Sequence, residues 1–123
     1  MKNIVLISQD KDFVLKFKEY FEFGDEYKVF HIFYEDKEEI EKLSPNIVLI
    51  DISHENLKEG LNILNYIKIS KTFQNLPIII ISSYYDTGFL FKILKEGAND
   101  FIEKTNNFDL IKERIERLVK GGL

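Results

Sequence analysis

Five short apolar runs, separated by segments with helical spacing, constrain the fold of this chain more than any other feature. A continuous run of Ile, Val and Leu is typical of a strand that is buried on both faces of a sheet. The runs are NIVLIS (3–8), YKVFHIF (27–33), NIVLID (46–51), PIIIIS (77–82) and NDFIE (99–103). Because each gap has room for one helix, the pattern predicts parallel strands joined by right-handed crossovers.

The segments between the runs space their apolar residues three, four and seven positions apart, as amphipathic helices do. The expected helices lie around 13–21, 36–43, 61–67, 90–97 and 111–118. The predicted fold class is therefore α/β: a doubly wound, five-stranded parallel sheet in the flavodoxin-like order 2-1-3-4-5, with helices on both faces. The third and fourth runs are the most uniformly aliphatic and are expected inside the sheet, whereas the second and fifth suit its edges.

The composition fits one globular domain, which we take as residues 1–123, either complete or the N-terminal domain of a longer protein. No apolar run reaches the ~18 residues of a membrane span, so no membrane contact is expected. The 17 Lys and Arg residues against 21 Asp and Glu give a net charge of −4, which argues against direct nucleic-acid binding. The absence of Cys excludes disulfides and fits a reducing, cytoplasmic location.

Polar residues stand at the points where the predicted strands end. In the order 2-1-3-4-5, the carboxyl ends of the first, third, fourth and fifth strands converge on one crevice. The residues at these ends are Ser8, Gln9, Asp10, Asp51, Ser82, Ser83 and Lys104. Burying an unpaired carboxylate is costly, so Asp51 is expected at the rim, beside solvent or a partner charge such as Lys104.

Three of these strand ends belong to longer motifs, which are PNIVLIDI (45–52), PIIIIS (77–82) and GANDFIEK (97–104). Together they resemble the receiver domain of two-component response regulators, and the resemblance covers residues 2–120. It implies that Asp51 is the phosphoacceptor, which takes a phosphoryl group from a histidine kinase. It also implies phosphoryl contacts by Ser82 and Lys104, and a conformational switch formed by Ser82 and Phe101.

The chemistry of phosphoryl transfer accounts for these residue types. A carboxylate at the rim can act as the nucleophile, and the charge on the phosphoryl oxygens calls for a fixed cation and a hydroxyl donor. Lys104 and Ser82 supply those groups. The alternatives are a structural salt bridge between Lys104 and Asp51, a hydrogen bond from Ser82 to a neighbouring carbonyl, and simple packing of Phe101.

The resemblance also implies partners and an output. The phosphodonor is a histidine kinase or a phosphotransfer protein, and the signal passes to an output protein or to an effector domain outside this chain. The signalling face is formed by the fourth helix (90–97), the fifth strand (99–103) and the fifth helix (111–118), and a homodimer can form through it. Such a module is not an enzyme beyond phosphoryl acceptance and slow self-dephosphorylation.

The end of the first strand departs from the family pattern. Ser8 and Gln9 stand at the positions of an acidic pair, and Asp10 falls one position late. In the family this pair holds Mg²⁺ with the phosphoacceptor; the ligands left here are Asp51, the Ser53 backbone carbonyl and the Gln9 amide oxygen. Because Mg²⁺ favours carboxylate oxygens, weak binding is expected. The alternative function is a phosphorylation-independent pseudo-receiver, a module for protein–protein interaction.

Three further features carry less weight. Tyr84 and Tyr85, an aromatic pair after the fourth strand, indicate an interaction surface. Gly60 comes nine residues after Asp51, where the family usually has a glycine eight residues after its acid. A flavodoxin-like enzyme or cofactor binder is disfavoured, because SQDKDF (8–13) contains no glycine for a phosphate-binding loop.

Overall fold

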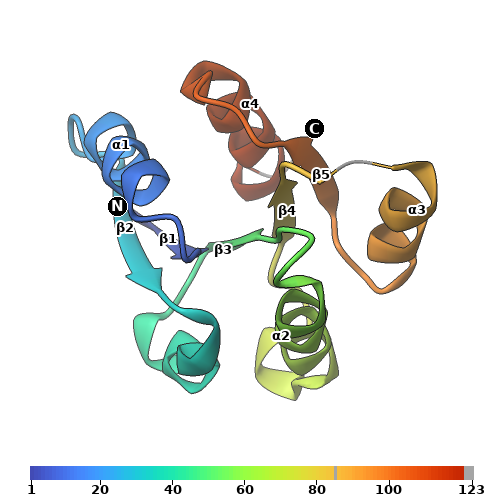
Figure 1. Ribbon diagram of the computed structural model, residues 1–123. Helices are drawn as coiled ribbons and strands as arrows, with labels where there is room; N and C mark the ends of the chain where they lie inside the picture. The colour runs from blue at the N-terminus through green and yellow to red at the C-terminus, as the bar shows by residue number, and fades with distance from the viewer. Residues whose placement is uncertain (85, 121–123) are drawn as a thin grey trace.

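The computed structural model describes residues 1–84 and 86–120, and this part of the chain forms one sheet of five parallel strands. The strands are β1 (Lys2–Ile7), β2 (Tyr27–Ile32), β3 (Ile47–Asp51), β4 (Ile78–Ser82) and β5 (Asp100–Glu103). Their order, β2-β1-β3-β4-β5, confirms the predicted fold class (Figure 1). The most aliphatic runs, β3 and β4, lie inside the sheet, and the more polar β2 and β5 form its edges.

Helices fill the gaps between the strands. They are α1 (Lys11–Phe21), η1 (Tyr34–Leu43), α2 (Leu57–Ile69), η2 (Lys71–Phe73), α3 (Thr87–Lys95) and α4 (Phe108–Val119). The helices predicted around 90–97 and 111–118, the fourth and fifth in order, correspond to α3 and α4. The second, expected at 36–43, is a 3-10 helix that begins at Tyr34 and leaves helical backbone angles at Asp36. The Asp36 carboxylate accepts the Phe33 N–H at 3.2 Å, as in a capping box at the start of η1.

The side chains of each strand alternate between two apolar cores. On one face, Val5 and Ile50 pack with η1, α2 and α3; on the other, Leu6 and Leu49 pack with α1 and α4. All four side chains are fully buried. Figure 1 shows these helices on opposite sides of the sheet. Because the inner strands are covered on both faces, they carry continuous apolar runs and no polar alternation.

Three helices begin at a side chain that caps the first turn. Asp10, Asp86 and Asn107 accept backbone N–H groups at the starts of α1, α3 and α4, at 3.1, 2.8 and 3.3 Å. Each cap follows a strand, so the three helix starts surround the carboxyl edge of the sheet. Cap residues fix where a helix begins, and here they also fix side chains beside the strand ends.

Gly60 allows α2 to approach the segment after β3 closely. The residue is buried, and a Cβ atom built on it would lie 2.4 Å from Ile52 Cγ1. Ile52, directly after β3, is itself fully buried. The glycine therefore sets the distance between α2 and the chain that leaves Asp51.

Replacement of this glycine tests that close approach. Gly60→Ala is expected to lower the free energy of unfolding by about 1–3 kcal/mol, because the added methyl group forces the helix away from Ile52. The measurement is urea denaturation. The control is Gly88→Ala in α3, where the nearest contact of the added Cβ is Asp86 Oδ1 at 3.3 Å; a change within about 1 kcal/mol is expected there. Equal losses in the two variants would contradict the account.

Candidate functional site

Asp51 ends β3 at the carboxyl edge of the sheet. Its backbone pairs with Ile81 of β4, and its neighbour Ile50 pairs with Ile7, the last residue of β1. The side chain is only 7% exposed. The Asp51 backbone carbonyl accepts a hydrogen bond from the hydroxyl of Tyr34, at the start of η1. A carboxylate this deeply placed requires nearby donors or a compensating charge.

Ser8 supplies the first of these donors. The residue is fully buried, and its hydroxyl donates to Asp51 Oδ2 at 2.7 Å. The same hydroxyl oxygen accepts the Asp10 N–H at 3.0 Å. The Ser8 carbonyl accepts a 2.7 Å hydrogen bond from His31 Nε2 on the edge strand β2. Ser8, which was predicted to stand at a position of the acidic pair, therefore donates to Asp51 as a neutral group.

Lys104 supplies the compensating charge. Its ammonium nitrogen lies 2.9 Å from Asp51 Oδ2 and 2.8 Å from Asp10 Oδ2. It also lies 5.0 Å from the ring centroid of Phe13, in a cation–π arrangement. Burial lowers the pKa of Lys104, but the hydrogen bonds to Asp10 and Asp51, with their charges, outweigh it and leave the pKa raised. The side chain is therefore cationic at neutral pH.

Asp10 is one of the residues of this site that the predicted phosphoacceptor, phosphoryl-contact and metal sets do not include. It was placed at a strand end but left out of the predicted site, because it falls one position after the expected acidic pair. Its Oδ1 caps α1 by accepting the Phe13 N–H, and its Oδ2 binds Lys104. The hydrogen bond from Lys104, followed by that from Phe13, lowers the pKa of Asp10. The available signal was its cap position, which directs the carboxylate back toward the end of β1.

A hollow of about 190 Å³ opens beside these groups. Its lining residues are Gln9, Asp10, Tyr34, Asp51, Ser53, Asn56 and Lys104. Tyr34 and Asn56 were not predicted to belong to the site. Burial, and then the charge of Asp51, raise the pKa of Tyr34, so its hydroxyl keeps its proton and donates. Asn56 donates from Nδ2 to Ser53 Oγ at 2.9 Å.

The oxygen atoms that line this hollow are not the set of ligands that a divalent cation prefers. Of the proposed metal ligands, Gln9 and Ser53 bring neutral oxygens and only Asp51 brings a charge. The second carboxylate, Asp10, shares the Lys104 ammonium with Asp51. Within residues 1–84 and 86–120, no group of three or more His, Cys, Asp and Glu side chains is placed to hold a metal ion. The present residues therefore do not fit Mg²⁺ well.

Ser82 lies close to the site but does not line the hollow. Its buried hydroxyl donates to the Ile52 carbonyl and accepts the Tyr84 N–H at 3.0 Å. The expected alternative for Ser82, a hydrogen bond to a neighbouring carbonyl, is therefore present. Phe101, on β5, packs against Phe89 of α3 with ring centroids 5.9 Å apart.

The Tyr84 ring lies between the segment after β3 and helix α3. Its ring contacts His54, after β3, at 4.8 Å between centroids and Phe89 at 5.2 Å. Its hydroxyl donates to Asp86 Oδ2 at 2.9 Å. Tyr84 is thus partly buried by intramolecular contacts, and its expected partner in the aromatic pair, Tyr85, lies outside the described residues.

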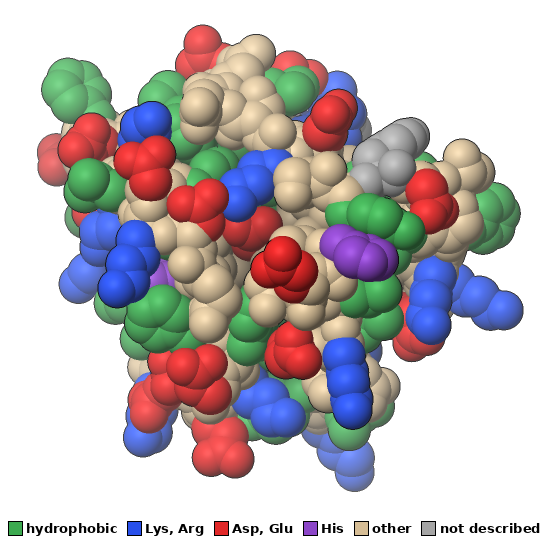
Figure 2. All heavy atoms as spheres, viewed as in Figure 1, with side chains coloured by type: hydrophobic (Ala, Val, Ile, Leu, Met, Phe, Trp, Pro, Cys, Tyr) green, Lys and Arg blue, Asp and Glu red, His purple; other side chains and the backbone are tan. Residues whose placement is uncertain are grey.

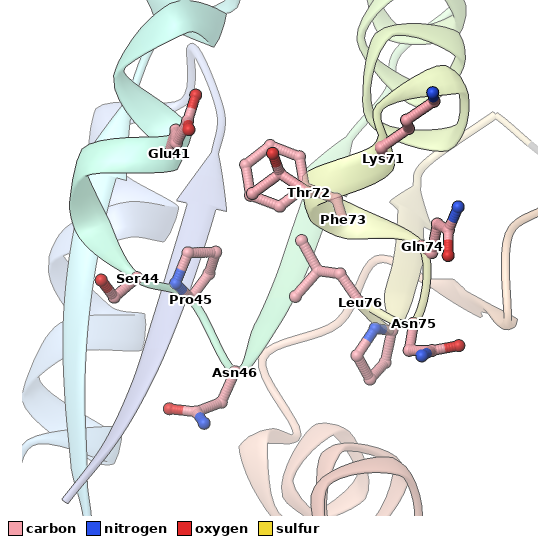
Figure 3. A pocket seen from close by; sticks show the side chains of 11 residues that line it. Glu41, Ser44, Pro45, Asn46, Lys71, Thr72, Phe73, Gln74, Asn75 and Leu76 are labelled. Atoms are coloured by element: carbon pink, nitrogen blue, oxygen red, sulfur yellow. The ribbon is translucent and has the colours of Figure 1, made fainter.

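A larger hollow, of about 530 Å³, lies at the opposite edge of the sheet. Figure 3 shows Phe73 and Leu76 on one side of it and Pro45 on the other, before β4 and β3 respectively. Its remaining lining is Pro77, side-chain amides and hydroxyls, and the charges of Glu41 and Lys71. None of the predicted site residues borders it, so its size does not make it the functional site.

The distribution of charge on the surface does not single out one class of partner. Figure 2 shows acidic side chains interspersed with basic ones over the visible face. None of the helices in the described part of the chain combines the length and the apolar character needed to cross a membrane.

Comparison with known proteins identifies sequence relatives. A family model for the response regulator receiver domain matches residues 4–116. The sensory transduction protein BceR of Halalkalibacterium halodurans is 29% identical over 122 residues, which cover 98% of this chain and 51% of BceR. The transcriptional regulatory protein KdpE of Staphylococcus aureus is 32% identical over 80 residues, 63% of this chain and 33% of KdpE. The chain thus spans about half the length of BceR and about a third of the length of KdpE.

Solved structures share the fold at low sequence identity. The signal receiver domain of a Luxo repressor protein from Vibrio parahaemolyticus has a TM-score of 0.85 at 21% identity, over 98% of this chain and 92% of that one. The phosphorylated cyanobacterial phytochrome response regulator RcpA has a TM-score of 0.83 at 18% identity, over 99% and 96%. The Mn²⁺-bound response regulator Rcp1 has a TM-score of 0.76 at 18% identity, over 95% and 93%. Because the family model matches residues 4–116 of the 123, the chain belongs to the receiver domain family of two-component response regulators.

Proposed function

We propose that this chain is a signalling module in which Asp51 accepts a phosphoryl group from the histidine of a kinase or a phosphotransfer protein. The observation that carries the proposal is the position of Asp51, at the carboxyl edge of the sheet with Lys104 2.9 Å from its Oδ2. The hollow beside it provides room for a phosphodonor. Family membership supports the partner class, since receiver domains work with histidine kinases in two-component systems.

The chemistry needs a nucleophile and fixed donors around the transferred group. Asp51 Oδ2 already accepts hydrogen bonds from Ser8 and Lys104. In this proposal a carboxylate oxygen of Asp51 attacks phosphorus, while Lys104 neutralises charge on the phosphoryl oxygens. Tyr34 and Asn56 line the hollow beside Asp51. Beyond this acceptance and a slow self-dephosphorylation, no catalytic activity is proposed.

The proposed output follows the connection from Ser82 to α3. A phosphoryl group that draws the Ser82 hydroxyl toward Asp51 would break its bonds to the Ile52 carbonyl and the Tyr84 N–H. Tyr84 contacts Phe89, and Phe89 contacts Phe101, so the change reaches α3 and β5. We assign signalling to the α3–β5–α4 face, through an output protein, an effector domain outside this chain, or a homodimer.

This face carries apolar surface suited to a partner. Phe91 and Leu94 of α3 are 74% and 45% exposed. Large exposed apolar side chains near one another are typical of interaction surfaces. Tyr84, although partly buried, lies beside the start of α3, and we include it in the proposed interface.

The proposed cofactor role of Mg²⁺ is a weak one. Mn²⁺ is bound by Rcp1, a structural relative. In this chain Asp51, the Ser53 carbonyl and the Gln9 amide oxygen are the proposed ligands, and Ser8 adds no charge. A site whose one carboxylate is already bound by Lys104 is expected to hold a hard divalent cation poorly, so phosphoryl acceptance is not proposed to depend on tight binding of Mg²⁺.

Phosphoryl transfer to Asp51 is tested by chemical labelling. Incubation with phosphoramidate and millimolar Mg²⁺ is expected to add one phosphoryl group to the native chain, and none to Asp51→Asn. Intact-protein mass spectrometry gives the labelled fraction. Asp12→Asn, an exposed acid paired with Lys16 at 3.2 Å, is the matched control and should label as the native chain does. An unlabelled native chain would refute phosphoryl acceptance and favour the pseudo-receiver alternative.

Restoring the acidic pair tests the role given to Ser8 and Gln9. Ser8→Asp/Gln9→Asp is expected to raise the affinity for Mg²⁺ by about tenfold or more, since two carboxylates join Asp51. Isothermal titration calorimetry measures the affinity, and a Mg²⁺-dependent rise in melting temperature shows whether the variant folds around the ion. Gln74→Asp/Asn75→Asp, at the opposite edge of the sheet, is the control for added charge. Equal affinities of the native chain and the double variant would contradict this assignment.

A further inference from the structure

One ammonium group joins both carboxylates of the site. Lys104 Nζ lies 2.8 Å from Asp10 Oδ2 and 2.9 Å from Asp51 Oδ2. The two acids come from the ends of different strands, and Lys104 comes from a third. The side chain of Lys104 is only 20% exposed, and the ring of Phe13 lies against its charge at 5.0 Å. The ammonium is therefore held from several sides.

Asp10 is held in place for this contact by its role in α1. Oδ1 accepts the Phe13 N–H at 3.1 Å, and the backbone N–H of Asp10 donates to Ser8 Oγ at 3.0 Å. With one carboxylate oxygen used by the cap, the other faces Lys104. Side-chain and main-chain hydrogen bonds thus fix the direction of the Asp10 carboxylate. A freely rotating surface aspartate would have no such fixed direction.

The same hydrogen bonds leave few carboxylate oxygens available as ligands for a metal ion. Asp51 Oδ2 accepts from both Ser8 and Lys104, at 2.7 and 2.9 Å. A divalent cation placed between Asp10 and Asp51 would lie against the ammonium and be repelled by it. The two carboxylates and one ammonium carry a formal charge of −1 together, so the cation of this site is already supplied by the chain.

We infer that the Lys104 ammonium, held by Asp10 as a positioning residue, is the resident cation of the site, and that Asp51 accepts a phosphoryl group without a divalent metal. This inference rests on the proposed function. The occupant of the adjoining hollow is then the phosphoryl group of a phosphohistidine or a phosphoramidate, and no metal ion accompanies it.

The transfer balances without a metal or any further reactant. A carboxylate oxygen of Asp51 forms the new O–P bond, and the P–N bond of the donor breaks. The donor nitrogen leaves with the electron pair of that bond, as ammonia when protonated phosphoramidate is the donor. Lys104 keeps its protons and neutralises charge that moves onto the phosphoryl oxygens.

The labelling rate with and without metal tests the inference. Native chain treated with phosphoramidate is expected to label in EDTA at a rate within about twofold of that in Mg²⁺, because no metal charge is used. Labelling that requires Mg²⁺ would overturn the inference and leave the proposed function standing. Absence of labelling in both conditions would overturn both.

Asp10→Asn separates the positioning role from the helix cap. Asn caps a helix as well as Asp does, so the melting temperature is expected to stay near the native value. The labelling rate in EDTA is expected to fall about tenfold, because Lys104 loses the charge that places it. Asp12→Asn removes the same charge two residues along and should leave the rate unchanged. A native rate in Asp10→Asn would show a purely structural role for Asp10.

A metal titration tests the resident cation independently of phosphorylation. Mn²⁺ relaxation measurements should detect no binding by the native chain at millimolar Mn²⁺. Lys104→Met, which frees two carboxylates, should gain affinity by about tenfold or more. Lys16→Met, which frees only Asp12, should gain none. If Lys104→Met is unstable, a rise of its melting temperature with Mn²⁺ gives the same information. Tight binding by the native chain, or no gain in Lys104→Met, would overturn the inference.

Discussion

The ion pair between Asp51 and Lys104 is the interaction on which the arrangement of the site depends. Asp51 is 7% exposed, and a charge this deeply buried is stable only with a partner and with hydrogen bonds to its oxygens. Ser8 provides one such bond, and Lys104 provides both a bond and the opposite charge. Lys104 in turn is held by Asp10, so removing Lys104 would leave Asp51 without an opposite charge and with Ser8 as its remaining side-chain donor.

The sheet order brings these groups together from distant parts of the sequence. Ser8 and Lys104 follow strands that are not neighbours: β1 lies on one side of β3, and β4 separates β3 from β5. Because all strands are parallel, their carboxyl ends meet at one edge, with Asp51 between the other two groups. The two apolar cores stabilise this order, and the capped helix starts place Asp10 beside it. Packing thus determines the geometry on which the proposed chemistry depends.

Much of the fold and part of the site could be predicted from the sequence. Fully buried parallel strands leave a continuous apolar run, which is why the strands around Leu49 and Ile80 and their order could be inferred. Asp51 and Lys104 were found because they end such runs. Asp10 and Tyr34 were missed, since their contacts depend on a helix cap and on a 3-10 helix that apolar spacing does not reveal. A side chain's direction follows from these local hydrogen bonds, and periodicity carries no information about it.

The most direct measurement of the central interaction is nitrogen-15 NMR of the lysine ammonium groups. If Asp10 and Asp51 hold Lys104 as described, its ammonium signal is separate from those of the exposed lysines and exchanges slowly with water. It then shifts in both Asp10→Asn and Asp51→Asn, and stays in place in Asp12→Asn. A Lys104 signal that exchanges as fast as that of exposed Lys92 would contradict the account.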